Sequence, residues 1–212
     1  MVNFLVHLGW SDAQEREFFD RPTLIEAFGF EGMGRTNSVF NLQPKDPKFF
    51  SDPKLMNMNA HYLRTMPLER LLPHVQEELE RAGLWQAAWQ GQQRNWFMAV
   101  VELLRSRFQR TTDFVTLGKA YFSDIFERPP MAAPPWLSDL VEILGQLSVF
   151  EAKNIEATLR SFLKQSSVKA ADLIAVVRTA VTGQPSGPDV IQILICLGQE
   201  RVVKRLRSVM FA

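Results

Sequence analysis

Residues 177–188, Val-Arg-Thr-Ala-Val-Thr-Gly-Gln-Pro-Ser-Gly-Pro, form a polar elbow between two apolar segments that carry a helical pattern. Glycine readily takes the left-handed conformation of a helix C-cap, so the first helix is predicted to end at Gly183, just over one turn after Arg178. Because proline is tolerated in a first helical turn, the next helix is predicted to start at Ser186. A third segment, rich in basic residues, opens at 197–201. Three helix ends and an arginine are therefore expected on one small surface.

Apolar residues recur at spacings of three and four along most of the chain, which predicts amphipathic helices. The first stripe is Leu68, Leu71, Leu72, Val75 and Leu79, in a helix that starts near Pro67 and ends at Gly83. Further stripes lie within 97–108, 114–122, 137–147, 155–163, 173–180 and 202–209. Only residues 38–42 suggest a short strand. The predicted fold class is mainly α.

Three proline-rich stretches interrupt this pattern, because proline cannot continue a helix or an inner strand. Residues 43–53 are predicted to be a loop, residues 127–135 are the best candidate boundary between helical subdomains, and residues 183–188 are the elbow itself.

Composition indicates a soluble globular protein, with 46% hydrophobic and 22% charged residues among 212. No apolar run nears the ~18 residues of a membrane span, and the start lacks a basic leader, so we expect a cytosolic location. The single cysteine, Cys196, excludes an intramolecular disulfide framework and is predicted to be a buried, inert thiol.

The net charge of +1 hides an asymmetry. Residues 153–212 carry 9 Lys and Arg against 4 Asp and Glu, whereas residues 1–152 carry 15 against 19. A basic excess at one end suits phosphate contact, although a solvated helix face explains it equally well.

No catalytic constellation stands out. His7, His61 and His74 are scattered without metal-ligand spacing, and no phosphate-binding loop, nucleophile elbow or paired catalytic carboxylates can be assembled. Trp85, Trp89 and Trp96, spaced by 4 and 7, are predicted to seal a helix seam rather than to stack on bases. We therefore expect no catalytic residue and no metal site.

The run from Val177 to Leu206 resembles the C-terminal end of the anticodon-binding part of bacterial glutamyl-tRNA synthetases, where "LR-x-A-x-TG…P…LG-x-ER…L-x-R-L" recurs. Residues 3–11 resemble the "N-[YF]-L-x-x-LGWS" segment of these enzymes, and residues 40–42 with 54–64 resemble their stem-contact run. Residues 107–122 are similar to their helical anticodon subdomain. The resemblance covers nearly the whole chain.

This resemblance implies a stem-contact subdomain at 1–66 and two helical anticodon-binding subdomains at 67–128 and 129–212. Such enzymes join glutamate to the 3′ end of its tRNA with ATP and magnesium. The chain contains no HIGH-like or K-M-S-K-[SR]-like motif, so we expect the nucleotide-binding half to be absent and this part to need no cofactor. The expected partner is a tRNA, that of glutamate, bound by a monomer.

The resemblance also implies roles for particular residues. Arg107 corresponds to the arginine that reads the third anticodon base, a task that a planar, permanently charged guanidinium suits. Arg178 and Val190 correspond to two further anticodon contacts. Gly187 stands where some relatives use threonine, so a hydroxyl contact is lost there or replaced by backbone. Arg105, near the same helix end, is the alternative to Arg107 as the base reader.

In the stem-contact segment, Lys54 and Arg64 are expected to hold phosphates or sugars. Asn57 replaces a usual tryptophan there, which removes a stacking surface, and the 43–53 loop is longer than in relatives.

Several alternatives stay open at the level of sequence. The basic residues Arg201, Lys204, Arg205 and Arg207 suit either a phosphate-facing surface or a plain solvated helix. The chain could instead be a stand-alone tRNA binder or a protein-interaction scaffold, and the latter would lack salt-dependent RNA affinity. Catalysis is viable only if the gene continues upstream of Met1. Whether the glutamine tRNA is also accepted is not readable from the residues.

Overall fold

The computed structural model describes residues 2–34 and 53–211, and they are almost entirely helical. Eleven α-helices and three short 3-10 helices lie within these ranges, which confirms the predicted mainly α class. The described residues contain no strand, only an isolated bridge between Trp10 and Met33. The predicted strand at 38–42 and nearly all of the 43–53 loop lie outside the described residues.

The chain divides into two compact units, residues 1–65 and residues 66–212. The finer division into three parts, with boundaries at 66 and 128, stays a prediction.

The first unit contains α1 (Val2–Val6), α2 (Arg21–Ala27) and α3 (Pro53–Thr65). Its small core gathers Trp10, Phe19 and Leu24. The hydroxyl of Tyr62, on α3, donates to the carbonyl of Phe19 at 3.0 Å and accepts from the Asn3 amide at 2.8 Å. These bonds attach α3 to the N-terminal segment.

In the second unit, α4 spans Leu68–Arg81 and buries the predicted stripe of leucines and valine. The helix is terminated at Gly83, two residues after Arg81, where the φ of +66° is the left-handed conformation expected of a glycine at a helix C-terminus. After the 3-10 turn Ala87–Gln90, α5 follows at Arg94–Arg105. The predictions for 67–83 and for the first part of 97–108 are confirmed.

The stripe predicted within 114–122 is not a continuous helix. The chain makes a 3-10 turn at Thr111–Phe114 and then the one-turn helix α6 (Lys119–Phe122), while Leu117 between them is 46% exposed. The cause is local. The Asp113 carboxylate accepts the backbone N–H groups of Gln109 and Arg110, each at 2.9 Å, which starts the 3-10 turn, and the N–H of Gly118 donates five residues back to the Asp113 carbonyl at 2.9 Å. These bonds favour a tight turn over helix continuation.

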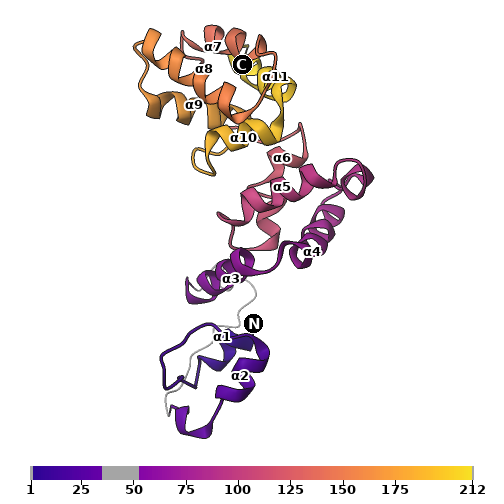
Figure 1. Ribbon diagram of the computed structural model, residues 1–212, viewed down its shortest axis with the longest axis vertical. Helices are drawn as coiled ribbons and strands as arrows, with labels where there is room; N and C mark the ends of the chain where they lie inside the picture. Colours follow the sequence, from indigo (N-terminus) through magenta and orange to yellow (C-terminus); the bar gives the residue numbers. More distant parts are fainter. Residues whose placement is uncertain (1, 35–52, 212) are drawn as a thin grey trace. The chain divides into compact units, whose positions relative to one another are not determined.

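Five further helices complete the unit: α7 (Leu137–Gly145), α8 (Ala152–Gln165), α9 (Ala170–Thr182), α10 (Val190–Leu197) and α11 (Gln199–Met210). They gather into one group in Figure 1, where α11 packs against α7 and α9. Helix α10 contacts both α8 and α9 within this group and α5 outside it. It therefore joins the two sets of helices.

The tryptophans form the predicted seam around Trp89, which is 3% exposed. The Trp89 ring lies 5.4 Å from that of Trp85 and 5.5 Å from that of Trp96, centroid to centroid. The indole N–H of Trp96 donates to the carbonyl of Cys196 at 2.6 Å, which ties α5 to α10. Cys196 itself is half-buried rather than buried, and burial raises the pKa of its thiol to about 11.

At the elbow, one predicted helix end is confirmed and one is wrong. Gly183 has φ +74° and caps α9 as expected. The next helix begins at Val190 and not at Ser186, because the Asp189 carboxylate accepts the N–H groups of Ile191 and Gln192 at 3.0 and 3.2 Å. This aspartate N-cap outweighs the tolerance of a first helical turn for proline, which had placed the predicted start at Ser186.

Candidate functional site

A pocket of about 280 Å³ opens where the C-terminal end of α5, the turn around α6 and the elbow after α9 meet. The α5 and α6 side contributes Leu104, Arg107, Phe108, Leu117 and Tyr121; the elbow side contributes Thr182, Gln184, Ser186, Gly187, Pro188 and Ile193. The pocket thus brings together Arg107 and Gly187, two of the residues singled out from the sequence.

Arg107 supplies the positive charge of this pocket. It follows the last turn of α5, and its backbone N–H donates to the carbonyl of Leu104 at 2.9 Å. Its side chain is exposed, and its guanidinium forms no hydrogen bond or ion pair with any residue of the described ranges. A guanidinium in this state offers its planar set of donors to a ligand.

Arg178 lies behind the elbow rather than among the lining residues. One terminal nitrogen donates to the carbonyl of Pro188 at 3.1 Å, across the elbow. Its Nε is buried and has no partner among the described residues. The side chain therefore supports the elbow and keeps one unsatisfied donor.

The absence of a side chain at Gly187 leaves room beside Arg178. A Cβ built at Gly187 would lie 3.7 Å from the Cδ of Arg178, which is ordinary van der Waals contact. The backbone therefore has room for a Cβ at this position.

Two other predicted contacts are largely covered by protein. Val190 is 5% exposed at the start of α10, and Arg105 is 9% exposed on α5, with its Nη1 3.4 Å from the Glu102 carboxylate. Of the two candidate base readers, the pocket contains Arg107 and not Arg105. The RNA-contacting roles of Val190 and Arg105 stay predictions.

Lys54 and Arg64 belong to the other unit, at the two ends of α3, and both are exposed. The Lys54 ammonium lies 3.5 Å from the Glu17 carboxylate. Their predicted contacts with an RNA stem stay predictions.

The C-terminal basic cluster is only partly the surface considered from the sequence, because two of its four residues bind within the protein. Arg205 is 5% exposed and donates to the carbonyls of Val181 at 2.7 Å and Ser123 at 2.9 Å. Arg201 donates to the carbonyl of Tyr121 at 3.2 Å, and both arginines bind the Asp124 carboxylate, at 3.0 and 3.1 Å. Only Lys204 and Arg207 point to solvent.

These internal ion pairs shift the ionisation of their members. Burial tends to raise the pKa of Asp124, but the hydrogen bonds and charges of Arg205 and Arg201 outweigh it, so the pKa is lowered. Burial lowers the pKa of Arg205, and the nearby charge of Arg201 adds to this effect. Sequence reasoning missed this linkage because Asp124 lies in an irregular segment about eighty residues earlier in the chain.

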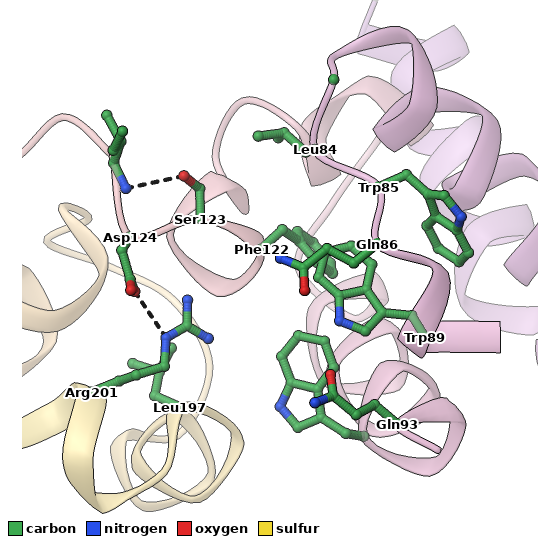
Figure 2. Close-up of a pocket in the computed structure, with 13 residues that line it drawn as sticks. Leu84, Trp85, Gln86, Trp89, Gln93, Phe122, Ser123, Asp124, Leu197 and Arg201 are labelled. Atoms are coloured by element: carbon green, nitrogen blue, oxygen red, sulfur yellow. Dashed lines mark hydrogen bonds and ion pairs between the residues drawn. The ribbon is translucent and has the colours of Figure 1, made fainter. Parts of the chain in front are cut away.

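The Asp124–Arg201 pair also lines a larger cavity of about 730 Å³. Figure 2 shows Gln86, Trp89 and Gln93 on one side of this cavity and Asp124 with Arg201 on the other. Arg201, the one cation among the lining residues, and the Asp124 carboxylate are both committed to bonds within the protein, so the smaller pocket with Arg107 is the better candidate site.

Within residues 2–34 and 53–211, no group of three or more His, Cys, Asp or Glu side chains is placed to hold a metal ion. No helix of the described chain is long and apolar enough to cross a lipid bilayer.

Comparison with known proteins shows the family to which the chain belongs. Residues 56–210 match the family described as "Anticodon binding domain". The glutamate–tRNA ligase of Desulfotalea psychrophila is 40% identical over 216 residues, covering 97% of this chain and 44% of that protein. Glutamate–tRNA ligase 2 of Koribacter versatilis is 34% identical and covers 97% of this chain and 42% of its own length. The chain therefore spans less than half of the relatives it matches.

A solved structure shares the fold. The crystal structure of a glutamate tRNA ligase from Elizabethkingia meningosepticum superposes with a TM-score of 0.78 over 100% of this chain and 40% of that one. At 20% sequence identity this likeness bears on the fold alone.

Proposed function

Because the chain belongs to the anticodon-binding domain family, we propose that it is the tRNA-reading part of a glutamate–tRNA ligase, specific for the anticodon of the glutamate tRNA. The single observation that carries this proposal is the pocket that Arg107 lines together with the elbow, with its guanidinium unpaired among the residues that the structure describes. The match to the family and the names of the relatives support it.

The geometry suits an unstacked base. RNA readers take bases out of the loop, pack them on apolar or aromatic side chains and hydrogen-bond their edges. Leu104, Phe108 and Ile193 supply apolar walls, and Arg107 supplies donors at the rim. In this proposal Arg107 reads the third anticodon base, while contacts to phosphates position the RNA without reading its sequence.

The proposal assigns recognition to this chain and leaves the ligation of glutamate, with ATP and magnesium, to sequence outside these 212 residues. Lys54 and Arg64 then hold the stem backbone. A cytoplasmic monomer suits this role, because protein synthesis consumes charged tRNA there.

The test is Arg107→Ala, assayed by filter binding with the cognate tRNA and with variants at the third anticodon base. Removing one base-reading arginine is expected to weaken cognate binding by about 1–3 kcal/mol and to relax the choice of base. Arg160→Ala is the matched control, since Arg160 is an exposed arginine on α8 that pairs with Glu156 outside the pocket.

Two results would contradict the proposal at different levels. Unchanged affinity and base preference in Arg107→Ala would remove that residue from the reading role. Wild-type protein that binds no tRNA in a salt-dependent manner would reject RNA recognition altogether and favour a protein-interaction scaffold, since counterion release makes RNA affinity fall with salt.

A further inference from the structure

The backbone of the elbow directs one amide side chain into the pocket. Gly183 is left-handed at φ +74°, and a Cβ there would collide with the carbonyl oxygen of Glu127, so only glycine fits. The next N–H, of Gln184, donates to the Thr182 hydroxyl at 3.2 Å, and that hydroxyl donates to the carbonyl of Arg178 at 2.8 Å. The backbone position of Gln184 is therefore fixed from its N-terminal side.

The side chain of Gln184 lines the pocket together with Arg107 and is half-buried there. Its carboxamide forms no hydrogen bond with the residues of the described ranges. A carboxamide carries a carbonyl acceptor and two N–H donors side by side. The carbonyl oxygen and the N–H donors of Gln184 are therefore available to a ligand in this largely apolar pocket.

The other groups on the elbow side are less suited to reading a base. The Thr182 hydroxyl is committed, since it both donates to and accepts from the backbone. Gly187 offers no side chain, and Pro188 offers no donor. The Ser186 hydroxyl also lines the pocket, but it is a single group on a short side chain. Gln184 is the elbow residue whose longer side chain carries a separate acceptor and separate donors.

We propose that Gln184 is a specificity-determining residue of this pocket, whose carboxamide hydrogen-bonds the edge of the unstacked anticodon base that Arg107 contacts. The inference rests on the proposed function. A glutamine amide pairs well with base edges that present a donor beside an acceptor. The contact compensates on the elbow side for the hydroxyl that Gly187 lacks.

The experiment compares Gln184→Met with wild type, since methionine keeps the length of the side chain and removes its hydrogen bonds. Each protein is titrated with an anticodon stem-loop RNA carrying the glutamate anticodon and with single-base variants of it. Gln184→Met is expected to bind the cognate RNA about tenfold more weakly than wild type does. Its affinity for the single-base RNA variants should be nearly unchanged, so the discrimination between anticodons becomes smaller. The salt dependence should not change, because no phosphate contact is lost.

Two further variants sharpen the result. Gln165→Met, at an exposed position on α8, is the matched control and is expected to behave as wild type. Gln184→Glu keeps the shape but only accepts hydrogen bonds, so relative preference should move toward RNAs with guanine at the position read, which presents adjacent donors.

The outcomes separate this inference from the proposed function. Equal discrimination by Gln184→Met and wild type would overturn the inference, and so would a loss of affinity that is uniform across all anticodons. Wild-type protein that fails to discriminate anticodons would overturn the proposed function itself. Circular dichroism spectra of both variants establish that each binding curve reports on folded protein.

Discussion

Arg205→Met is expected to destabilise the second unit strongly, although the sequence places this residue in a basic helix that looks solvated. Three bonds are lost: to the carbonyls of Val181 and Ser123, at 2.7 and 2.9 Å, and to Asp124 at 3.1 Å. The Asp124 side chain is 54% exposed, so water replaces that partner at little cost. The Val181 carbonyl belongs to a buried residue, and an unsatisfied buried acceptor costs about 1–3 kcal/mol.

The Ser123 carbonyl also loses its donor, and it adds a smaller cost of the same kind because Ser123 is only half-buried. Burial lowers the pKa of Arg205, which means that burying its charge is unfavourable. The methionine avoids this cost, which offsets some of the loss in stability. The expected sum is about 2–4 kcal/mol, or a fall in melting temperature of about 5–15 °C for a chain of this size.

The assay is thermal unfolding followed by circular dichroism at 222 nm, with urea unfolding as a second measure. Arg207→Met is the matched control, since Arg207 lies on the same helix, points to solvent and carries the same charge. Surface substitutions of this kind usually stay within about 0.5 kcal/mol. If the free energies of unfolding of the two variants differ by less than about 1 kcal/mol, the burial argument for Arg205 is refuted, because surface substitutions alone give differences of roughly this size.

Two further outcomes follow from the elbow and the seam. Gly183→Ala should lower the free energy of unfolding by about 3 kcal/mol, because it puts a side chain on a left-handed residue and against the Glu127 carbonyl. Gly187→Ala should change it by no more than about 1 kcal/mol. Similar midpoints of urea unfolding for the two variants would contradict this reasoning. Cys196, with its thiol pKa raised to about 11 by burial, should react with a disulfide reagent at pH 8 about two orders of magnitude more slowly than in urea-unfolded protein. Its rate should keep rising up to about pH 11, and a plateau near pH 8.5 would show an ordinary thiol.

The helices were largely predictable because each buries one apolar face, and that face repeats along the sequence. The stripe at Leu68–Leu79 is an example, since every one of its members from Leu71 onward is buried in α4. The errors arose where a single side chain redirects the backbone. Asp113 turns the chain before α6, and Asp189 rather than Ser186 caps α10. Hydrophobic periodicity carries no information about such local hydrogen bonds.

The pocket was less predictable than the helices. Arg107 and Gly187 are eighty residues apart, and they meet because α10 packs against α5 and α9 packs against α6. Local patterns do not encode this packing, so only the resemblance to a family suggested a shared site. Gln184 had no sequence signal at all, because its importance depends on the left-handed glycine before it and on the unused state of its amide.

Burial changes what the charge asymmetry of the chain means. Residues 153–212 carry 9 basic residues, but Arg205 is buried against carbonyls and Arg201 is paired with Asp124 and the Tyr121 carbonyl. A buried or paired guanidinium has already exchanged water for protein partners, so it releases few counterions when RNA binds. Arg201 and Arg205 therefore join the segment after α6 to α9 and α11, whereas six of the nine basic residues at this end are exposed: Lys153, Arg160, Lys164, Lys169, Lys204 and Arg207. In the proposed function, sequence-specific contact is assigned instead to the exposed Arg107, which the more acidic remainder of the chain supplies.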